Sequence, residues 1–169
     1  VGDPRSRPGR GTGDLLVTGA TGLLGRRVCA LLGARHTHHR ALVRPGSGHE
    51  LQGTEGYGWS IDGDLLAPAT LTGPLDGVTR ALHLAGLVRS DDAAACRALH
   101  VEGTRALLDR GGSLRRVVAL SSDTVGRARP GAYAASKAQM ESLLRERAAA
   151  GLQVVVLRPP MMLGPGSPH

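Results

Sequence analysis

Tyr133 and Lys137 are the two residues of this chain whose types and spacing most directly suggest chemistry. They lie four residues apart in the segment YAASK, so a helix through this segment would place both on one face. A phenol can give a proton to a developing alkoxide, and a neighbouring ammonium lowers the pKa of a phenol toward neutrality. Lysine also donates several hydrogen bonds to hydroxyl groups. The pair therefore predicts proton transfer at a carbonyl or hydroxyl group.

The amino-acid composition gives this pair more weight. The 169 residues include 20 arginines but one lysine, Lys137, and only two tyrosines. This bias is typical of a very GC-rich coding sequence, so the rare residue types that persist carry information. Arginine would supply a charge with a different geometry from a compact ammonium. The alternative is a surface pair on an amphipathic helix.

A glycine-rich segment is the second chemical feature. The sequence TGATGLLG, residues 18–25, follows a short apolar stretch and opens a segment with helical spacing. In a strand–turn–helix context such glycines permit a tight turn, let the backbone approach a pyrophosphate and allow the helix to pack on the strand. Because 25 of the 169 residues are glycine, an ordinary glycine-rich turn is the alternative.

Short apolar stretches alternate with helical segments along the chain, which predicts a parallel sheet covered on both faces. The expected strands are residues 15–17, 40–43, 59–61, 80–84, 116–120 and 153–157, and the expected helices are 23–32, 69–75, 91–109 and 133–149. The predicted fold is a three-layer, doubly wound α/β domain whose sheet of about six strands has the order 3-2-1-4-5-6. Residues 1–13, rich in Gly, Pro and Arg, are expected to be a flexible leader to a domain over 14–169.

Charge and hydropathy exclude several classes of protein. The net charge is +7, but the arginines are scattered and aromatic residues for base stacking are nearly absent, so no nucleic-acid partner is expected. No apolar run approaches the roughly 18 residues that span a bilayer, and no signal peptide is evident. We therefore expect no membrane association and a cytoplasmic location.

The cysteines and clustered histidines predict neither a disulfide nor a metal site. Cys29 and Cys96 lie on expected helices, where they are interpreted as buried thiols. His36, His38 and His39 have no cysteine or carboxylate partner at useful spacing, so they are expected to lie in a solvated loop before the second strand.

Eight segments in order resemble the extended branch of the short-chain dehydrogenase/reductase family, the NAD-dependent epimerase/dehydratase type. They are TGATGLLG, ALVRPGSG, DGDLL at 62–66, HLAG at 83–86, HVEGTRALL at 100–108, ALSSDTVG at 119–126, YAASK at 133–137 and LRPPMMLGPG at 157–166. The resemblance implies an NAD(P)-binding Rossmann fold. It also implies hydride transfer at a carbonyl or carbinol carbon of a small-molecule substrate, with Tyr133 as acid and base.

The resemblance further implies which residues hold the cofactor. Contacts are expected from Gly19, Thr21, Gly22, Leu23, Leu24, Gly25, Arg44, Asp64, Leu65, Leu84, Ala85, Gly86, Tyr133, Lys137 and Pro159. Asp64 would accept a hydrogen bond from the adenine amine, or be a simple turn aspartate. Arg44 stands at the strand end where an acidic residue would favour NAD, and its guanidinium could hold a 2′-phosphate. NADP(H) is therefore favoured over NAD(H), with a plain surface arginine as the alternative.

Ser122 is expected to be the catalytic serine that binds the substrate oxygen and orients Tyr133, with Ser121 as the alternative. His100 departs from the family, because many members carry asparagine there; it could form a hydrogen bond or lie on a helix surface. Met161, Met162 and Leu163 stand where polar or aromatic residues often contact substrate. They indicate a less polar substrate, or core packing.

The chain ends soon after the sixth expected strand, so we expect the C-terminal substrate-binding portion of the family to be absent. Three interpretations follow: an enzyme or its cofactor-binding portion, a catalytically inactive dinucleotide-binding sensor or scaffold, or a truncated gene product. Reductase, dehydratase and epimerase are not distinguished, because all three use the same hydride chemistry. A homodimer is one alternative for the quaternary state.

Overall fold

The computed structural model describes residues 14–46, 57–87, 90–162 and 164. The leader expected over 1–13 and the residue Leu163 lie outside this part of the chain. The described elements are β1 (Leu15–Thr18), α1 (Leu23–Ala34), β2 (His39–Val43), β3 (Gly58–Asp62), the 3-10 turn η2 (Pro68–Leu71), α2 (Thr72–Leu75), β4 (Arg80–His83), α3 (Ala93–Arg97), η3 (Ala98–Glu102), α4 (Gly103–Arg110), β5 (Arg116–Leu120), α5 (Ala132–Ala149) and β6 (Gln153–Leu157).

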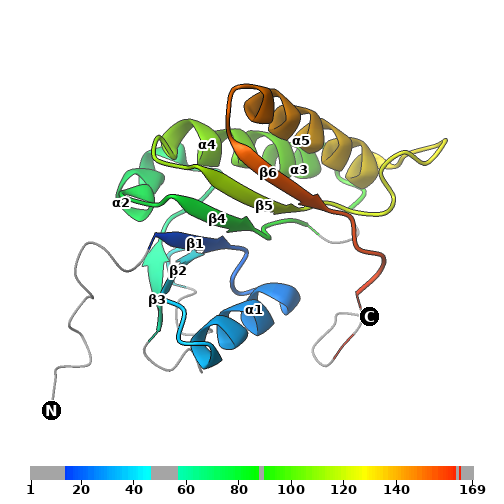
Figure 1. Ribbon diagram of the computed structural model, residues 1–169. Helices are drawn as coiled ribbons and strands as arrows, with labels where there is room; N and C mark the ends of the chain where they lie inside the picture. Colours follow the sequence, from blue (N-terminus) through cyan, green and yellow to red (C-terminus); the bar gives the residue numbers. More distant parts are fainter. Residues whose placement is uncertain (1–13, 47–56, 88–89, 163, 165–169) are drawn as a thin grey trace, which may run out of the picture.

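The six strands form one parallel sheet in the order β3-β2-β1-β4-β5-β6, which confirms the predicted topology (Figure 1). The register places Val17 of β1 between Ala41 of β2 and Leu82 of β4. The strand order reverses between β1 and β4, because β2 and β3 are added on one side of β1, and β4, β5 and β6 are then added on the other side. A crevice for a ligand forms at such a switch point, outside the carboxyl ends of the strands.

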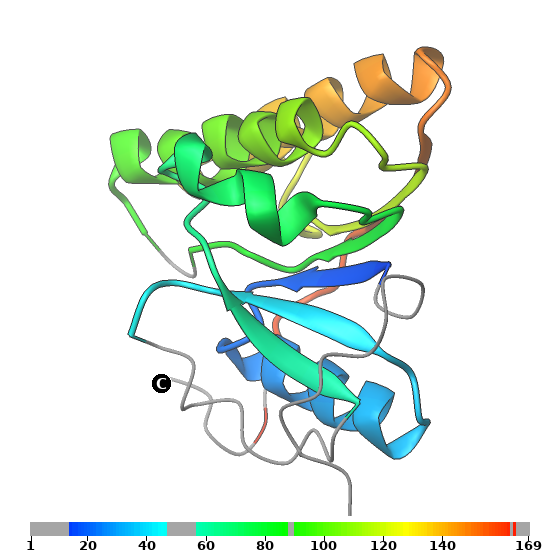
Figure 2. The ribbon, with the colours of Figure 1, turned by 90° about the vertical axis from the view of Figure 1, so that its left-hand side faces the viewer.

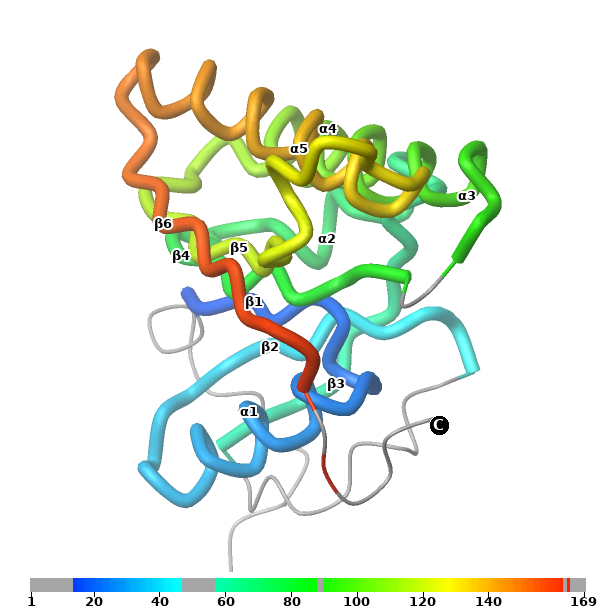
Figure 3. Tube along the Cα trace, turned by 90° about the vertical axis from the view of Figure 1, so that its right-hand side faces the viewer, coloured from blue at the N-terminus to red at the C-terminus, as the bar shows by residue number. Residues whose placement is uncertain are grey.

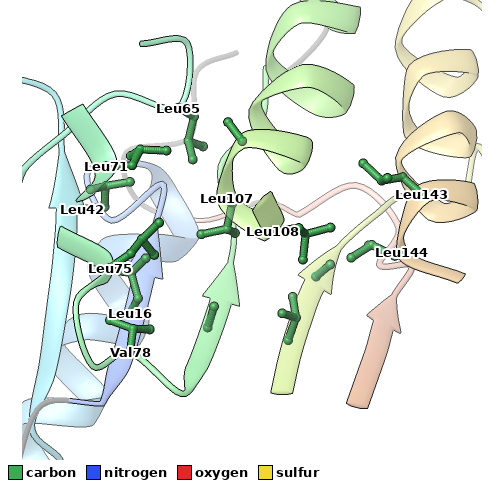
Figure 4. Close-up of a cluster of buried hydrophobic side chains, with 14 of the residues drawn as sticks. Leu16, Leu42, Leu65, Leu71, Leu75, Val78, Leu107, Leu108, Leu143 and Leu144 are labelled. Carbon is green, nitrogen blue, oxygen red and sulfur yellow. The ribbon is translucent and has the colours of Figure 1, made fainter. Parts of the chain in front are cut away.

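Helices cover the two faces of the sheet unequally. Of the described helices in Figure 2, α2, α3, α4 and α5 lie above the sheet, and α1 alone lies below it. The larger core lies between the sheet and α2, α4 and α5 (Figure 4). It contains the buried side chains Leu16, Leu42, Leu65, Leu71, Leu75, Val78, Ala81, Ala106, Leu107, Leu108, Val117, Ala119, Met140, Leu143 and Leu144. A smaller core of Val17, Ala20, Cys29 and Ala41 lies on the α1 face. Successive strand residues thus face opposite cores, as a sheet buried on both faces requires.

The segment predicted as one helix over 91–109 is instead three pieces, of which the middle one, η3, is a π-helix. Asp92 begins the first piece, since its Oδ1 accepts from the Ala95 N–H at 3.0 Å. The wider turn at η3 contains His100, which is buried rather than on the helix surface. Such π-turns often occur at functional positions.

The prediction that His36, His38 and His39 lie in a solvated loop is wrong for His39. His39 is the first residue of β2 and is fully buried, because the strand begins one residue earlier than predicted. His36 is exposed, and its ring packs on Tyr57 with centroids 4.6 Å apart. Within the described residues, no group of three His, Cys, Asp or Glu side chains could hold a metal ion. Cys29 and Cys96 are buried on α1 and α3 as predicted.

None of the helices in the described part of the chain combines the length and the apolar character that crossing a membrane requires.

Candidate active site

A cleft of about 640 Å³ opens at the carboxyl edge of the sheet. Its walls come from the segments that follow β1, β4, β5 and β6 and from the start of α5. Figure 3 shows the end of β6 beside the start of α1. The predicted site residues that line it are Gly19, Gly22, Leu23, Leu24, Gly25, Leu84, Gly86, Ser122, Tyr133, Lys137 and Pro159. The fold thus brings together segments more than 130 residues apart in the sequence.

The glycine loop leaves room for a ligand because two of its positions exclude a side chain. Gly19 has φ of +68°, and a Cβ there would lie 2.6 Å from the Ala85 nitrogen. A Cβ on Gly25 would collide with the carbonyl oxygen of Gly19. Gly22 is the N-cap of α1 and forms no side-chain cap, so the backbone N–H groups of the first turn remain open toward the cleft.

Other predicted cofactor residues do not line this cleft. Arg44 lies exposed just after β2, and Thr21 is half-buried. Asp64 has the geometry of a turn aspartate, since its Oδ1 accepts from the Leu66 N–H at 2.9 Å. Leu65 packs in the larger core and is 6% exposed. Ala85 lies behind the glycine loop, where its N–H donates to Thr18 Oγ1 at 3.3 Å.

The two serines after β5 have different partners. Ser121 donates to Glu141 Oε1 at 2.6 Å, and Arg158 binds the same carboxylate with Nε at 2.8 Å from Oε1. These hydrogen bonds tie the ends of β5 and β6 to α5 and hold the pKa of Glu141 below its usual range, with Arg158 as the main cause. Ser122 Oγ instead lies 2.9 Å from Thr124 Oγ1 and accepts from the Thr124 N–H at 3.2 Å. Ser122 lines the cleft together with Tyr133, whose pKa it lowers, which leaves it as the better candidate for the catalytic serine.

Tyr133 and Lys137 lie on one face of α5, at the cleft. Burial raises the pKa of Tyr133, and the Ser122 hydrogen bond opposes this rise only in part. The expectation that Lys137 lowers the pKa of Tyr133 in the free chain is therefore wrong. Lys137 is 2% exposed, its Nζ donates to the Leu120 carbonyl at 2.8 Å, and burial lowers its own pKa to about 8.

His100 packs against Tyr133 and lies near Lys137, with Gly86 next to both His100 and Lys137. Its ring packs edge-on against that of Tyr133, with centroids 5.4 Å apart and planes at 84°. A Cβ on Gly86 would lie 3.2 Å from Lys137 Nζ and 3.3 Å from His100 Nε2, so a side chain at this position would crowd both groups. Burial, and then the positive charge of Lys137, lower the pKa of His100 to about 3, which keeps the imidazole neutral.

The methionines after β6 lie in the cleft rather than in the core. Met161 and Met162 line it and are 66% and 40% exposed. Core packing, one of the two interpretations of this segment, therefore does not describe them.

Sequence reasoning missed Glu141 and Arg158 because their role depends on three elements meeting. The one local signal is that Glu141 follows Lys137 by four residues and so lies on the same face of α5.

The chain is similar to two named bacterial proteins. It is 29% identical over 161 residues to the ceramide reductase of Caulobacter vibrioides, a match that covers 91% of this chain and 48% of that protein. It is 33% identical over 171 residues to sterol demethylase protein B of Methylococcus capsulatus, covering 89% and 52% of the two chains. The chain thus spans about half the length of these relatives.

A solved structure shares both fold and sequence features. It is a short-chain dehydrogenase/reductase superfamily protein from Agrobacterium tumefaciens with bound NAD, which has a TM-score of 0.71, is 29% identical and is matched over 85% of this chain and 48% of that one. The family model that describes the NAD dependent epimerase/dehydratase family matches residues 15–169. Together with the strand order and the glycine loop, this match shows that the chain belongs to the NAD dependent epimerase/dehydratase family.

Proposed function

We propose that this chain is the cofactor-binding and catalytic portion of an NAD(P)-dependent oxidoreductase or epimerase. It would act at a carbonyl or carbinol carbon, with Tyr133 as acid and base. The observation that carries this proposal is the convergence of the glycine loop, Ser122, Tyr133 and Lys137 on one cleft. Since the chain spans about half of its relatives, the activity of the whole protein belongs to the proposal.

The cleft fits a nicotinamide dinucleotide. Gly19 and Gly25 keep side chains out of the space next to the first turn of α1, where a pyrophosphate would meet open N–H groups. Gly86 lines the cleft without a side chain that would fill the space beside Lys137. The cofactor, when bound, supplies or accepts the hydride.

The side chains around the cleft would manage the proton. In reduction, the Tyr133 hydroxyl gives its proton to the oxygen of the reacting carbonyl, and Ser122 donates a hydrogen bond that holds this oxygen in place. Lys137 has three N–H donors, of which one binds the Leu120 carbonyl. The others are available to ribose hydroxyls of the cofactor.

NADP(H) is the favoured cofactor because of Arg44. It stands immediately after β2, where an acidic side chain would select the ribose 2′-hydroxyl of NAD, and it is exposed. A guanidinium there can bind a 2′-phosphate with two parallel hydrogen bonds. Titration of the purified chain with NADPH and with NADH, followed by fluorescence, tests both the cofactor site and this preference. Failure to bind either dinucleotide would overturn the proposed function.

We further propose a substrate with an extended apolar part. Met161 and Met162 offer exposed apolar surface at the cleft, where a sugar substrate would need hydrogen-bonding groups. The relatives named for ceramide and sterol chemistry support the same class of substrate. Turnover of long-chain ketones, with no turnover of nucleotide sugars, is the expected result for a chain that includes the substrate-binding portion.

A further inference from the structure

A continuous chain of buried hydrogen bonds runs beneath the candidate site. It includes the side chains of Thr18, His83, Thr104, His100 and Ser136, each at most 3% exposed. Thr18 Oγ1 lies 2.8 Å from His83 Nδ1, and His83 Nε2 lies 2.8 Å from Thr104 Oγ1. Thr104 donates to the His100 carbonyl at 2.6 Å. These hydrogen bonds therefore connect the strand before the glycine loop to the helix that carries Tyr133.

The last links of this chain fix the protonation of His100. Ser136 donates its only hydroxyl proton to the Tyr133 carbonyl at 2.8 Å, so it must accept from His100 Nδ1, also at 2.8 Å. The Leu87 N–H donates to His100 Nε2 at 3.0 Å. Each ring nitrogen thus has one role: Nδ1 carries the proton and Nε2 accepts. If His100 were protonated, Nε2 would carry a hydrogen that points at the Leu87 N–H, and the hydrogen bond between them would be lost.

These contacts exclude His100 as a proton donor to substrate and indicate a different role. The ring is 1% exposed, and both nitrogens are engaged by the protein itself. One nitrogen holds the segment after β4, where Gly86 and Leu87 line the cleft. The other holds Ser136 and, through it, the first turn of α5, next to Tyr133.

We infer that His100 is a positioning residue, which joins the cofactor-facing segment at Gly86–Leu87 to the first turn of α5 and so sets the place of Tyr133. The inference rests on the proposed function, in which the Gly86–Leu87 segment binds the cofactor and α5 carries the proton donor Tyr133. The wide turn of η3 lies between α3 and α4, where a ring from this helix can reach both segments at once. The joint acts through hydrogen bonds of a neutral imidazole and not through its charge.

Two substitutions distinguish a role for the hydrogen bonds of His100 to Leu87 and Ser136, called the joint here, from a role in which the ring only fills space. In His100→Phe a ring still fills the space, but both hydrogen bonds are lost. In His100→Gln the ring is lost, but the amide oxygen can reach as far as Nε2 and accept from Leu87. A packing role predicts that Phe is tolerated better than Gln, whereas the joint predicts the opposite order.

NADPH is the probe for the Gly86–Leu87 side of the joint. We expect His100→Phe to weaken NADPH binding about three- to tenfold, the usual effect of one lost hydrogen bond, and His100→Gln to restore most of it. Near-normal binding by the Phe variant, or weaker binding by Gln than by Phe, would overturn the inference. Circular dichroism of each variant shows that the fold is retained.

The Tyr133 side has its own readout, which needs no cofactor. Tyr57→Phe leaves Tyr133 as the only tyrosine, and biosynthetic 3-fluorotyrosine then reports its ionisation by fluorine NMR. Ser136→Ala removes one oxygen and leaves the Leu87 bond intact. We expect it to lower the pKa of Tyr133, by a factor of about three in the ionisation constant, because the first turn of α5 loosens and the phenol becomes better hydrated.

The two readouts keep failure of this inference distinct from failure of the proposed function. An unchanged fluorine titration in Ser136→Ala would disprove the joint even where the cofactor binds normally. If the unmutated chain binds neither NADPH nor NADH, the proposed function fails. The fluorine titration then still decides whether His100 and Ser136 position Tyr133.

Discussion

The two edges of the sheet each carry a cleft of nearly the same size. At the amino edge, a cleft of about 670 Å³ lies between the α4–β5 and α5–β6 connections. It is lined mainly by glycines, leucines and the exposed ion pair of Asp109 with Arg147. At the carboxyl edge, the cleft of about 640 Å³ holds the glycine loop, Ser122, Tyr133 and Lys137. Volume alone therefore does not distinguish the candidate site.

The ionisable groups at the two edges differ in burial. Amino-edge pairs such as Asp14 with Arg80 lie in water, with side chains 37% and 47% exposed. At the carboxyl edge His83, His100 and Lys137 are each at most 2% exposed, and burial lowers the pKa of all three. His39 at the amino edge is also buried, and burial lowers its pKa. Three such groups meet at the carboxyl edge, however, and keeping them in a dry site is unfavourable for stability, so their concentration there indicates function.

The largest difference between the edges should come from the two tyrosines. Tyr133→Phe removes the proposed acid, and turnover should fall about 10²- to 10⁴-fold while NADPH affinity stays within about twofold. Tyr57→Phe, next to His36 and His38 at the amino edge, is the matched control and should retain the normal rate. The assay uses a chain that includes the substrate-binding portion. Normal turnover by Tyr133→Phe would show that the proton comes from another group.

Acid should destabilise the chain mainly through the carboxyl edge, with a further contribution from buried His39 at the amino edge, whose pKa burial also lowers. Burial lowers the pKa of His83 and of His100 to about 3, against about 6.5 in the unfolded chain. The unfolded state therefore binds more protons between about pH 6.5 and pH 3, and stability falls as the pH falls through this window. At pH 5 each histidine should lower the free energy of unfolding by about 2 kcal/mol relative to pH 7.5.

Urea denaturation at the two pH values measures this effect. His36→Gln, which changes an exposed amino-edge histidine, should show the same pH dependence as the unmutated chain. A flat stability profile between pH 7.5 and pH 5 would mean that the buried histidines are better hydrated than their contacts indicate.

Arg44 provides a comparison within the carboxyl edge. Arg44→Asp should weaken NADPH binding by about 1.5–3 kcal/mol, because a charge-assisted pair with the 2′-phosphate is lost, and leave NADH binding nearly unchanged. Arg35→Asp makes the same charge change at the exposed C-cap of α1 and serves as the control. Equal losses for both dinucleotides would indicate that Arg44 only supports its loop.

The smallest effect is expected at the amino edge. Asp14 accepts from Arg80 at 2.7 Å and from the Thr79 hydroxyl at 2.5 Å, and mainly the Arg80 hydrogen bond lowers the pKa of Asp14. Water screens this pair, so Asp14→Asn should change the free energy of unfolding by less than about 1 kcal/mol at pH 7. The contribution of Asp14 is present above its unfolded pKa and is lost as the pH falls through the folded one. A loss of several kcal/mol in urea denaturation would contradict the contrast between the edges.

The sequence was sufficient to predict the strands, their order and the position of the glycine loop. The strands follow from local apolar patterns, and their order is that of the dinucleotide-binding fold that the glycine loop indicates. It did not predict the π-turn or the burial of His100, because the partner Ser136 is 36 residues away. Leu65 was assigned to the cofactor by resemblance, whereas its side chain packs in the larger core. The raised pKa of Tyr133 also depends on burial, which YAASK alone does not reveal.

The burial of Lys137 has a practical consequence for covalent labelling. No other side chain of the 169 residues carries a primary amine, and this one is 2% exposed with a pKa lowered to about 8. Near that pH a sizeable fraction of the amine is unprotonated and nucleophilic, so access alone limits its acylation. A small amine-directed ester would therefore attach to a lysine side chain only when it enters the cleft. Mass spectrometry of one arginine-bounded peptide would then report how often the cleft is open.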